Sequence, residues 1–207
     1  RHLLWKGTGA EREINGKNKA KLHVLETRRA RRALSEKPVP EEVLARVMTA
    51  ATYAPSCFNN QPWRFLVANR EEELEIVKEH LSSGNYWAKK APVIVLVFTK
   101  PDLDCRLSDS RDYAFFSTGL AVESLLLQAT REGLIAHPIA GYKPLPLKEA
   151  FGVDREMILI TLVIIGYPGD GAHLSDKHSE LEHGARNRKP EDQVIMYNRW
   201  VEAGVEE

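Results

Sequence analysis

The 207-residue sequence lacks a continuous apolar segment long enough to cross a membrane. A spanning helix needs about 18 or more apolar residues in a row. The longest apolar run, MILITLVIIGY at 157–167, is shorter and rich in β-branched residues, which suits a buried strand. The first 23 residues contain no apolar stretch like that of a signal peptide. We therefore expect no membrane partner, and we predict an N-terminal extension at 1–24 before one domain at 25–207.

Cysteine is scarce, and neither sign of charge is in excess. The two cysteines, Cys57 and Cys105, have neither the spacing of metal ligands nor that of a disulfide framework, which indicates a reducing cytosol and predicts a cytoplasmic protein. The 29 Lys and Arg residues balance the 29 Asp and Glu residues, so no overall field attracts DNA or an acidic membrane. Any anion must therefore be bound by a local cluster of basic residues.

Several common catalytic motifs are also missing. The GTG at 7–9 has no preceding strand and no third glycine, and no Walker A motif occurs. The histidines at 173, 178 and 183 are five residues apart, which is not a usual zinc spacing. No Cys-His pattern, G-x-S-x-G elbow or carboxylate pair stands out. We therefore predict no metal and name no catalytic side chain.

Helical and strand patterns alternate along the chain. Apolar residues at helical spacing predict helices at 40–54, 71–81, 109–132 and 146–152, with a short helical candidate at 23–34. Apolar runs predict strands at 64–69, 91–98, 135–141 and 157–166, and 193–200 is a candidate for one more. Because two of these strands are apolar at almost every residue, they need cover on both faces. This predicts an α/β sandwich with helices on a mixed sheet.

Two arginine clusters lie near the two ends of the chain, in TRRARRAL (27–34) and HGARNRKP (183–190). On a helix, Arg28 and Arg32 would share a face and repel, and a bound phosphate would relieve that repulsion. Arg186 and Arg188 are two apart and would point to one side of an extended segment. Either one anionic ligand is held from two directions, or the clusters are separate solvated patches or bind nucleic acid.

The stretch APSCFNNQPW at 54–63 is unusually polar for a connection between a helix and a strand. Its amide side chains match the C=O/N–H edge of a uracil-like ring. The two prolines lower the entropy cost of holding these groups in place. The stretch is therefore either a ligand-binding loop or a well-capped connection.

The stretch AHPIAGY at 136–142 has a short extended pattern that ends in Gly141. A glycine there lets a ligand approach the backbone N–H and C=O groups closely. His137 precedes Pro138, which holds it extended. We interpret His137 as structural rather than catalytic.

Together and in this order, these stretches resemble the FMN-dependent nitroreductase family from about Leu25 to Trp200. The resemblance rests on TRRARRAL, APSCFNNQPW, a PIxGY-type strand, EAFGV and a closing RxRxP segment. It implies an obligate homodimer with a mixed, mostly antiparallel central sheet flanked by helices. It also implies that a C-terminal strand, here 193–200, crosses to the partner's sheet, and that two FMN sites are built from both chains.

The resemblance also implies which residues bind FMN. Arg28 would meet the phosphate, Arg32 would lie near the ribityl chain and the N1/C2=O edge, and a backbone N–H near Ala140 would donate to flavin N5. The loop of the partner chain would contribute the side chains of Ser56 and Asn59. The full implied set is Arg28, Arg29, Arg32, Pro55, Ser56, Cys57, Asn59, Pro138, Ile139, Ala140, Gly141, Arg186 and Arg188.

The implied activity is that of an NAD(P)H-linked flavin oxidoreductase, in which the cofactor performs the chemistry. NAD(P)H would reduce the flavin and leave, and a nitroaromatic, quinone or similar acceptor would then take its place. The alternative is a specialised enzyme of the same fold: a dehalogenase, a desaturase or a flavin-degrading enzyme. A nucleic-acid-binding module that uses TRRARR is disfavoured by the neutral total charge and the apolar strands.

Overall fold

The computed structural model describes residues 22–200 and contains a four-stranded sheet in the order β1-β2-β4-β3. Each pair of neighbouring strands is antiparallel, so β1 and β3 lie at the edges. The predicted fold class, helices around a mostly antiparallel sheet, is confirmed. The strands are β1 (Arg64–Ala68), β2 (Val93–Thr99), β3 (Ile135–Ile139) and β4 (Ile158–Gly166).

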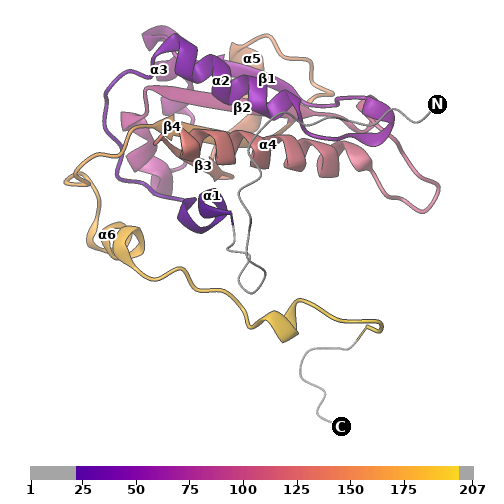
Figure 1. The fold of residues 1–207 in the computed structure, drawn as a ribbon. Coiled ribbons are helices and arrows are strands. Elements are labelled where there is room, and N and C mark those ends of the chain that lie inside the picture. Colours follow the sequence, from indigo (N-terminus) through magenta and orange to yellow (C-terminus); the bar gives the residue numbers. More distant parts are fainter. Residues whose placement is uncertain (1–21, 201–207) are drawn as a thin grey trace, which may run out of the picture.

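Helices cover both faces of the sheet (Figure 1). α2 and α4 pack on one face, and α3 and α5 lie on the other. Among residues 22–200, no helix has the length and apolar character to cross a membrane. The helices are α1 (His23–Thr27), α2 (Glu41–Thr52), α3 (Glu71–Glu79), α4 (Tyr113–Arg131), α5 (Pro144–Ala150) and α6 (Asp176–His183).

The apolar run of β2 reflects its position at the centre of the sandwich. Val93, Val95 and Val97 pack toward α2 and α4, whereas the alternate residues Ile94 and Leu96 pack toward α3 and α5. Every residue of β2 is buried. Because successive side chains of a strand point to opposite faces, a strand covered on both sides must be apolar throughout.

The helix expected at 23–34 ends at Thr27, so that prediction is wrong for 28–34. These residues instead follow an irregular, non-helical path, and Ala33 and Leu34 lie beside the segment that follows β4. Leu34 bridges Pro168, and the Gly169 N–H donates to the Ala33 carbonyl at 2.7 Å. A Cβ at Gly169 would lie 2.7 Å from the Leu34 carbonyl oxygen, so the two segments approach as closely as a glycine allows. Arg28 and Arg32 therefore do not share a helix face, contrary to the expectation.

The C-terminal part also differs from the prediction. A helix, α6, forms in the histidine-containing stretch, where no helix was predicted, and the Ser175 hydroxyl caps it by accepting from the His178 N–H. Residues 193–200 form no strand within this chain. After α6 the chain instead runs away from the sheet (Figure 1).

The interpretation of the cysteines is wrong, because Cys57 and Cys105 form a disulfide bond. They are 48 residues apart in sequence, and the sheet register explains their meeting. Arg64 at the start of β1 pairs with Phe98 at the end of β2. The loop before β1 and the loop after β2 therefore emerge at the same end of the sheet. The inference of a reducing cytosol loses its basis.

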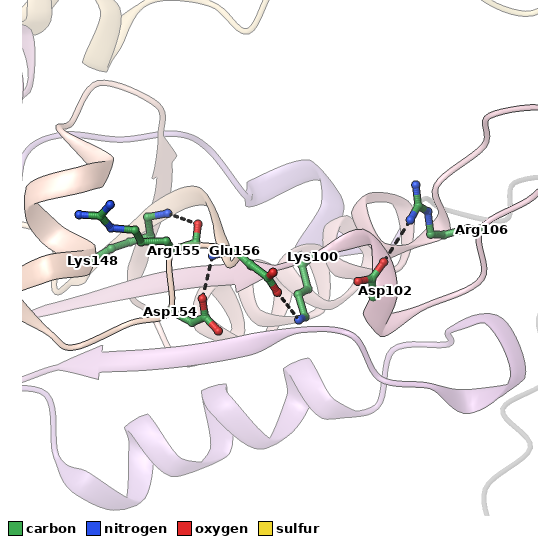
Figure 2. A network of polar contacts seen from close by, with 7 residues as sticks. All are labelled: Lys100, Asp102, Arg106, Lys148, Asp154, Arg155 and Glu156. Atoms are coloured by element: carbon green, nitrogen blue, oxygen red, sulfur yellow. Dashed lines mark hydrogen bonds and ion pairs between the residues drawn. The ribbon is translucent and has the colours of Figure 1, made fainter.

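Charged side chains tie the segments at this end of the sheet together (Figure 2). The ammonium group of Lys100 donates to the Glu156 carboxylate at 3.1 Å, which joins the end of β2 to the segment before β4. Arg106 donates to Asp102 at 3.1 Å within the loop that carries Cys105. The first contact therefore links two neighbouring strands at this end of the sheet, and the second lies within the loop.

Candidate functional site

Guanidinium groups from the two ends of the described chain converge on one open pocket of about 220 Å³. The Arg29 side chain donates to the Gly184 carbonyl at 2.6 Å, and Arg186 donates to the Leu25 and Arg28 carbonyls at 3.0 and 3.2 Å. Among the described residues, no acidic side chain lines the pocket, so its charge suits a phosphate. The lining residues are Arg28, Arg29, Ala30, Ala185, Arg186, Asn187 and Arg188.

Glu182 of α6 holds the arginine segment beside this pocket. Its side chain is only 3% exposed, and one carboxylate oxygen accepts from the Arg32 backbone N–H at 2.6 Å. The other oxygen lies 3.6 Å from the guanidinium of Arg31. Glu182 was not predicted as a site residue, because a single glutamate in a charged stretch carries no signal of burial.

Arg32, Trp87 and His137 form a stack that extends from the arginine segment to β3. The Arg32 guanidinium lies 5.8 Å from the centre of the Trp87 ring, and that ring lies 4.7 Å from the His137 ring. A cation above an indole is stabilised by the ring electrons. Trp87 was not predicted as a site residue, since nothing in its surrounding sequence marks it.

The environment of His137 keeps its imidazole neutral at pH 7. Burial is the largest cause that lowers its pKa, to about 4; the hydrogen bond to the Arg31 carbonyl opposes this, and the nearby charge of Arg32 adds to the lowering. Neutral His137 can donate from Nδ1 to the Arg31 carbonyl oxygen, 2.9 Å away. Its contacts accord with the structural role expected for it.

The predicted residues at the end of β3 lie on an edge of the sheet. Pro138 and Ile139 belong to β3, and the exposed Ala140 follows directly. The Gly141 carbonyl accepts from the Asn85 side chain at 2.8 Å, which fixes the chain just past Ala140. A Cβ at Gly141 would lie 2.6 Å from that Asn85 nitrogen, so any larger residue would have to displace the Asn85 side chain.

The polar loop before β1 lies far from the arginines within the chain. Its disulfide partner, Cys105, accepts from the Tyr113 N–H at 3.0 Å, so the loop sits at the N-terminal end of α4. Arg29 lines a separate cavity with Arg131, at the C-terminal end of α4. α4 has 19 residues and is therefore about 28 Å long. One chain does not bring the two halves of the predicted site together.

Within that loop, the predicted residues use different groups. The Ser56 hydroxyl accepts from the Gln61 N–H at 2.9 Å, and Pro55 and Asn59 are exposed. The sulfur of Cys57 is bonded, so this residue offers only its backbone to a ligand. The loop thus presents an ordered, polar surface to its surroundings.

One group within residues 22–200 brings three possible metal ligands to within 4.8 Å of one another: Cys57, Asp104 and Cys105. Both sulfurs are joined in the disulfide, so neither is a thiolate. In this state the group offers a single carboxylate, which is too few ligands for a structural zinc site.

Comparison with known proteins identifies the family. The model of the nitroreductase family matches residues 25–85 and 77–167. A relative from Methanothermobacter thermautotrophicus, provisionally named an NADH dehydrogenase/NAD(P)H nitroreductase, is 28% identical over 183 residues, which cover 84% of this chain and 93% of the relative. Rat iodotyrosine deiodinase 1 is 26% identical over 225 residues, which cover 94% of this chain and 75% of that protein.

A solved structure described as an oxidoreductase containing FMN has a TM-score of 0.78 and is 28% identical, covering 90% of this chain and 96% of that one. A nitroreductase family protein from Clostridium difficile 630 shares the fold, with a TM-score of 0.70 and 22% identity over 86% of this chain and 97% of that one. The fold and the shared sequence define an oxidoreductase enzyme. The chain belongs to the nitroreductase family.

Proposed function

We propose that this chain is an FMN-dependent oxidoreductase that transfers reducing equivalents from NAD(P)H to nitroaromatic, quinone or similar acceptors. The observation that carries the proposal is the convergence of Arg28, Arg29, Arg186 and Arg188 on one pocket. The FMN named in the description of a solved relative supports the choice of cofactor. The names of the curated relatives support NAD(P)H as the donor.

The pocket fits the phosphate of FMN. Each guanidinium has five N–H donors, so the arginines that bind Gly184 and Leu25 carbonyls keep further donors for an anion. Those carbonyl contacts orient the guanidinium groups before a ligand arrives, which lowers the entropy cost of binding. Arg28 would bind the phosphate together with Arg29, Arg186 and Arg188.

The flavin ring would lie along the end of β3. Pro138, Ile139, Ala140 and Gly141 would line it, with the backbone N–H near Ala140 donating to N5. Arg32 would lie at the N1/C2=O edge, where its charge stabilises negative charge on the ring. When bound, FMN supplies the redox chemistry: hydride uptake from NAD(P)H and electron delivery to the acceptor. The protein binds and orients, and we assign no catalytic acid or base.

A second copy of the chain would complete each site. The polar loop lies about 28 Å from the arginines along α4, so Pro55, Ser56, Cys57 and Asn59 would serve the FMN bound mainly by the partner chain. Within residues 22–200, the outer edge of β1 has no strand neighbour. Residues 193–200 of the partner would form the strand that pairs there.

The class of electron acceptor is the more specific part of the proposal. The relatives named as nitroreductases and as iodotyrosine deiodinases have similar identity to this chain, 28% and 26%. Relatedness therefore favours neither over the other, and a dehalogenating enzyme of the same fold is the competing assignment. A cytoplasmic location stays a prediction, without support from the cysteines.

The cofactor is tested by the absorbance spectrum of the purified protein, followed by anaerobic titration with NADH and with NADPH. We expect a yellow protein whose flavin band bleaches with one or both donors. Nitroaromatic, quinone and halogenated aromatic acceptors would then be compared by the rate at which they restore the band. A colourless protein that ignores added FMN would overturn the proposal.

The site assignment is tested by replacing Arg28 and Arg188 together with alanine. Two lost charged hydrogen-bond donors, at about 1.4 kcal/mol or more each, should weaken FMN binding about a hundredfold or more. Arg111→Ala with Arg155→Ala is the matched control, because both arginines are exposed and pair with other carboxylates. Equal FMN affinity in the two double variants would contradict the assignment.

A further inference from the structure

The disulfide Cys57–Cys105 joins two loops. One is the polar loop at 54–63, which is predicted to face the flavin and is called the flavin-facing loop below. The other is the loop between β2 and α4, called the Cys105 loop. Both cysteines are only partly buried, so the bond is not enclosed in the core of the protein. A change in the oxidation state of this disulfide would therefore act directly on a proposed ligand-binding segment.

The backbone of the flavin-facing loop needs strong restraints. Phe58, Asn59 and Gln61 have φ angles of 47°, 58° and 49°, in the left-handed region that non-glycine residues rarely occupy. Such conformations persist only where the surroundings hold them. In addition, the Phe58 side chain is 92% exposed, so burial of its ring contributes little to holding the loop.

Three contacts connect this loop to the Cys105 loop. One is the disulfide itself, and the other two are made by the Asn60 side-chain amide, which donates to the Asp104 carboxylate at 3.1 Å and to the Cys105 sulfur at 3.9 Å. The Cys105 loop is fixed in turn, because the Cys105 carbonyl accepts from the first residue of α4, Tyr113. Cleavage of the disulfide would therefore release mainly the Cys57 side.

The structure also accommodates the reduced pair. The Asp104 side chain is 8% exposed, and its Oδ2 atom has no hydrogen-bond partner within the described residues. The sulfurs of Cys57 and Cys105 lie within 4.8 Å of this carboxylate. An S–H group donates weakly to an oxygen, so a thiol formed here has an acceptor in reach. The oxidised state leaves that acceptor unpaired.

We propose that Cys57–Cys105 is a reversible thiol–disulfide switch that sets FMN affinity through the order of residues Cys57–Asn59 in the flavin-facing loop. The FMN part rests on the function proposed above. A dithiol reductant supplies the electrons: one of its thiolates attacks a sulfur, the S–S bond breaks, and its second thiol resolves the mixed disulfide. Two electrons and two protons pass to the cysteines, and the reductant leaves as a disulfide.

The switch is tested on full-length protein in two forms, oxidised and reduced with dithiothreitol, each desalted under argon into buffer with EDTA. The mass shift after alkylation verifies that the oxidised form has no free thiol per chain and that the reduced form has two. Amide hydrogen exchange of residues 55–63 is measured without flavin, with α2 as the internal reference. Reduction should speed exchange of the loop and weaken FMN binding, each about tenfold, a usual size of coupling between sites. Reoxidation should restore both.

Cys57→Ser with Cys105→Ser should behave as the reduced form and ignore dithiothreitol. The wild-type comparison needs no variant and decides the question even if this variant folds poorly. Equal loop exchange in the oxidised and reduced forms would overturn the switch. If neither form binds FMN, the proposed function fails, and loop exchange still decides whether the bond orders the loop.

Discussion

His137 is held neutral between the Trp87 ring and the Arg31 carbonyl, and this has a consequence for stability at acid pH. Its pKa is about 4 in the folded protein, against 6.5 for an ordinary histidine. Below pH 6.5 the unfolded chain takes up a proton that the folded chain does not accept until near pH 4. Stability therefore falls as the pH falls through this window.

Between pH 6.5 and 4, this single group should lower the free energy of unfolding by about 3 kcal/mol. His137→Phe keeps an aromatic ring against Trp87 but removes the titrating group. The free energy of unfolding of this variant should therefore fall by about 3 kcal/mol less than that of the wild type between pH 6.5 and 4. Urea unfolding at intervals of half a pH unit measures the difference. His183→Gln, at an exposed position, serves as the control and should keep the wild-type slope. A slope in His137→Phe as steep as in the wild type would contradict this account.

Residue types with strong chemical preferences were the predictable part of the site. Arginines near both ends allowed either one anion held from two directions or two separate patches, and in the structure Arg28 and Arg188 line one pocket. Trp87 and Glu182 were not predictable, because their roles depend on which segment packs against them. A tryptophan and a glutamate look the same in sequence whether they are buried beside an arginine or exposed.

At the scale of elements, α6 matters because it carries Glu182, which positions the arginine segment. Glu182→Gln keeps an acceptor for the Arg32 N–H but removes the charge that faces Arg31. We expect a loss of about 1–3 kcal/mol in the free energy of unfolding, as for a weakened buried hydrogen bond to a charged group. Denaturant unfolding measures this loss.

Glu180→Gln lies on the same helix at an exposed position and is the matched control for Glu182→Gln. It should change stability by less than about 0.5 kcal/mol. Equal effects of the two substitutions would mean that the buried carboxylate does not hold the arginine segment.

The central strands were predictable and the peripheral segments were not, for one physical reason. β2 and β4 are apolar because both faces are covered, and that pattern needs no knowledge of particular partners. Residues 28–34 are not helical because Arg32 bonds to Glu182 of α6 and Ala33 bonds to the segment after β4, contacts that no local pattern reveals. Likewise, the meeting of Cys57 and Cys105 follows from the register of β1 on β2.

The whole molecule has an arm after α6 that leaves the body of the chain (Figure 1). Large apolar side chains on this arm are exposed, including Tyr197 at 82% and Trp200 at 80%. Monomeric soluble proteins rarely gather such side chains in the open, and they often mark an interaction surface. A second copy of the chain, whose β1 edge has no strand neighbour within residues 22–200, is the partner that we propose.

A chain that ends at residue 190 keeps Arg186 and Arg188 but loses the apolar part of the arm. We expect it to be a monomer at concentrations where the full chain is a dimer, as measured by light scattering after size-exclusion chromatography. Removal of residues 201–207 alone is the control and should leave the dimer intact. A monomeric full chain, or a dimer that survives the cut at 190, would contradict the exchange of arms.

The length of α4 has a genetic consequence. Suppose that each flavin contacts the arginines of one subunit and the polar loop of the other. Substitutions in these two regions can then be placed in different subunits of one dimer. A variant without Arg28 and a variant without Asn59 would each be impaired in every site of its own homodimer. Mixed after unfolding and refolding, they would yield heterodimers in which one site has both lesions and the other has neither. Activity would then recover in the mixture, as in complementation between two alleles of one gene.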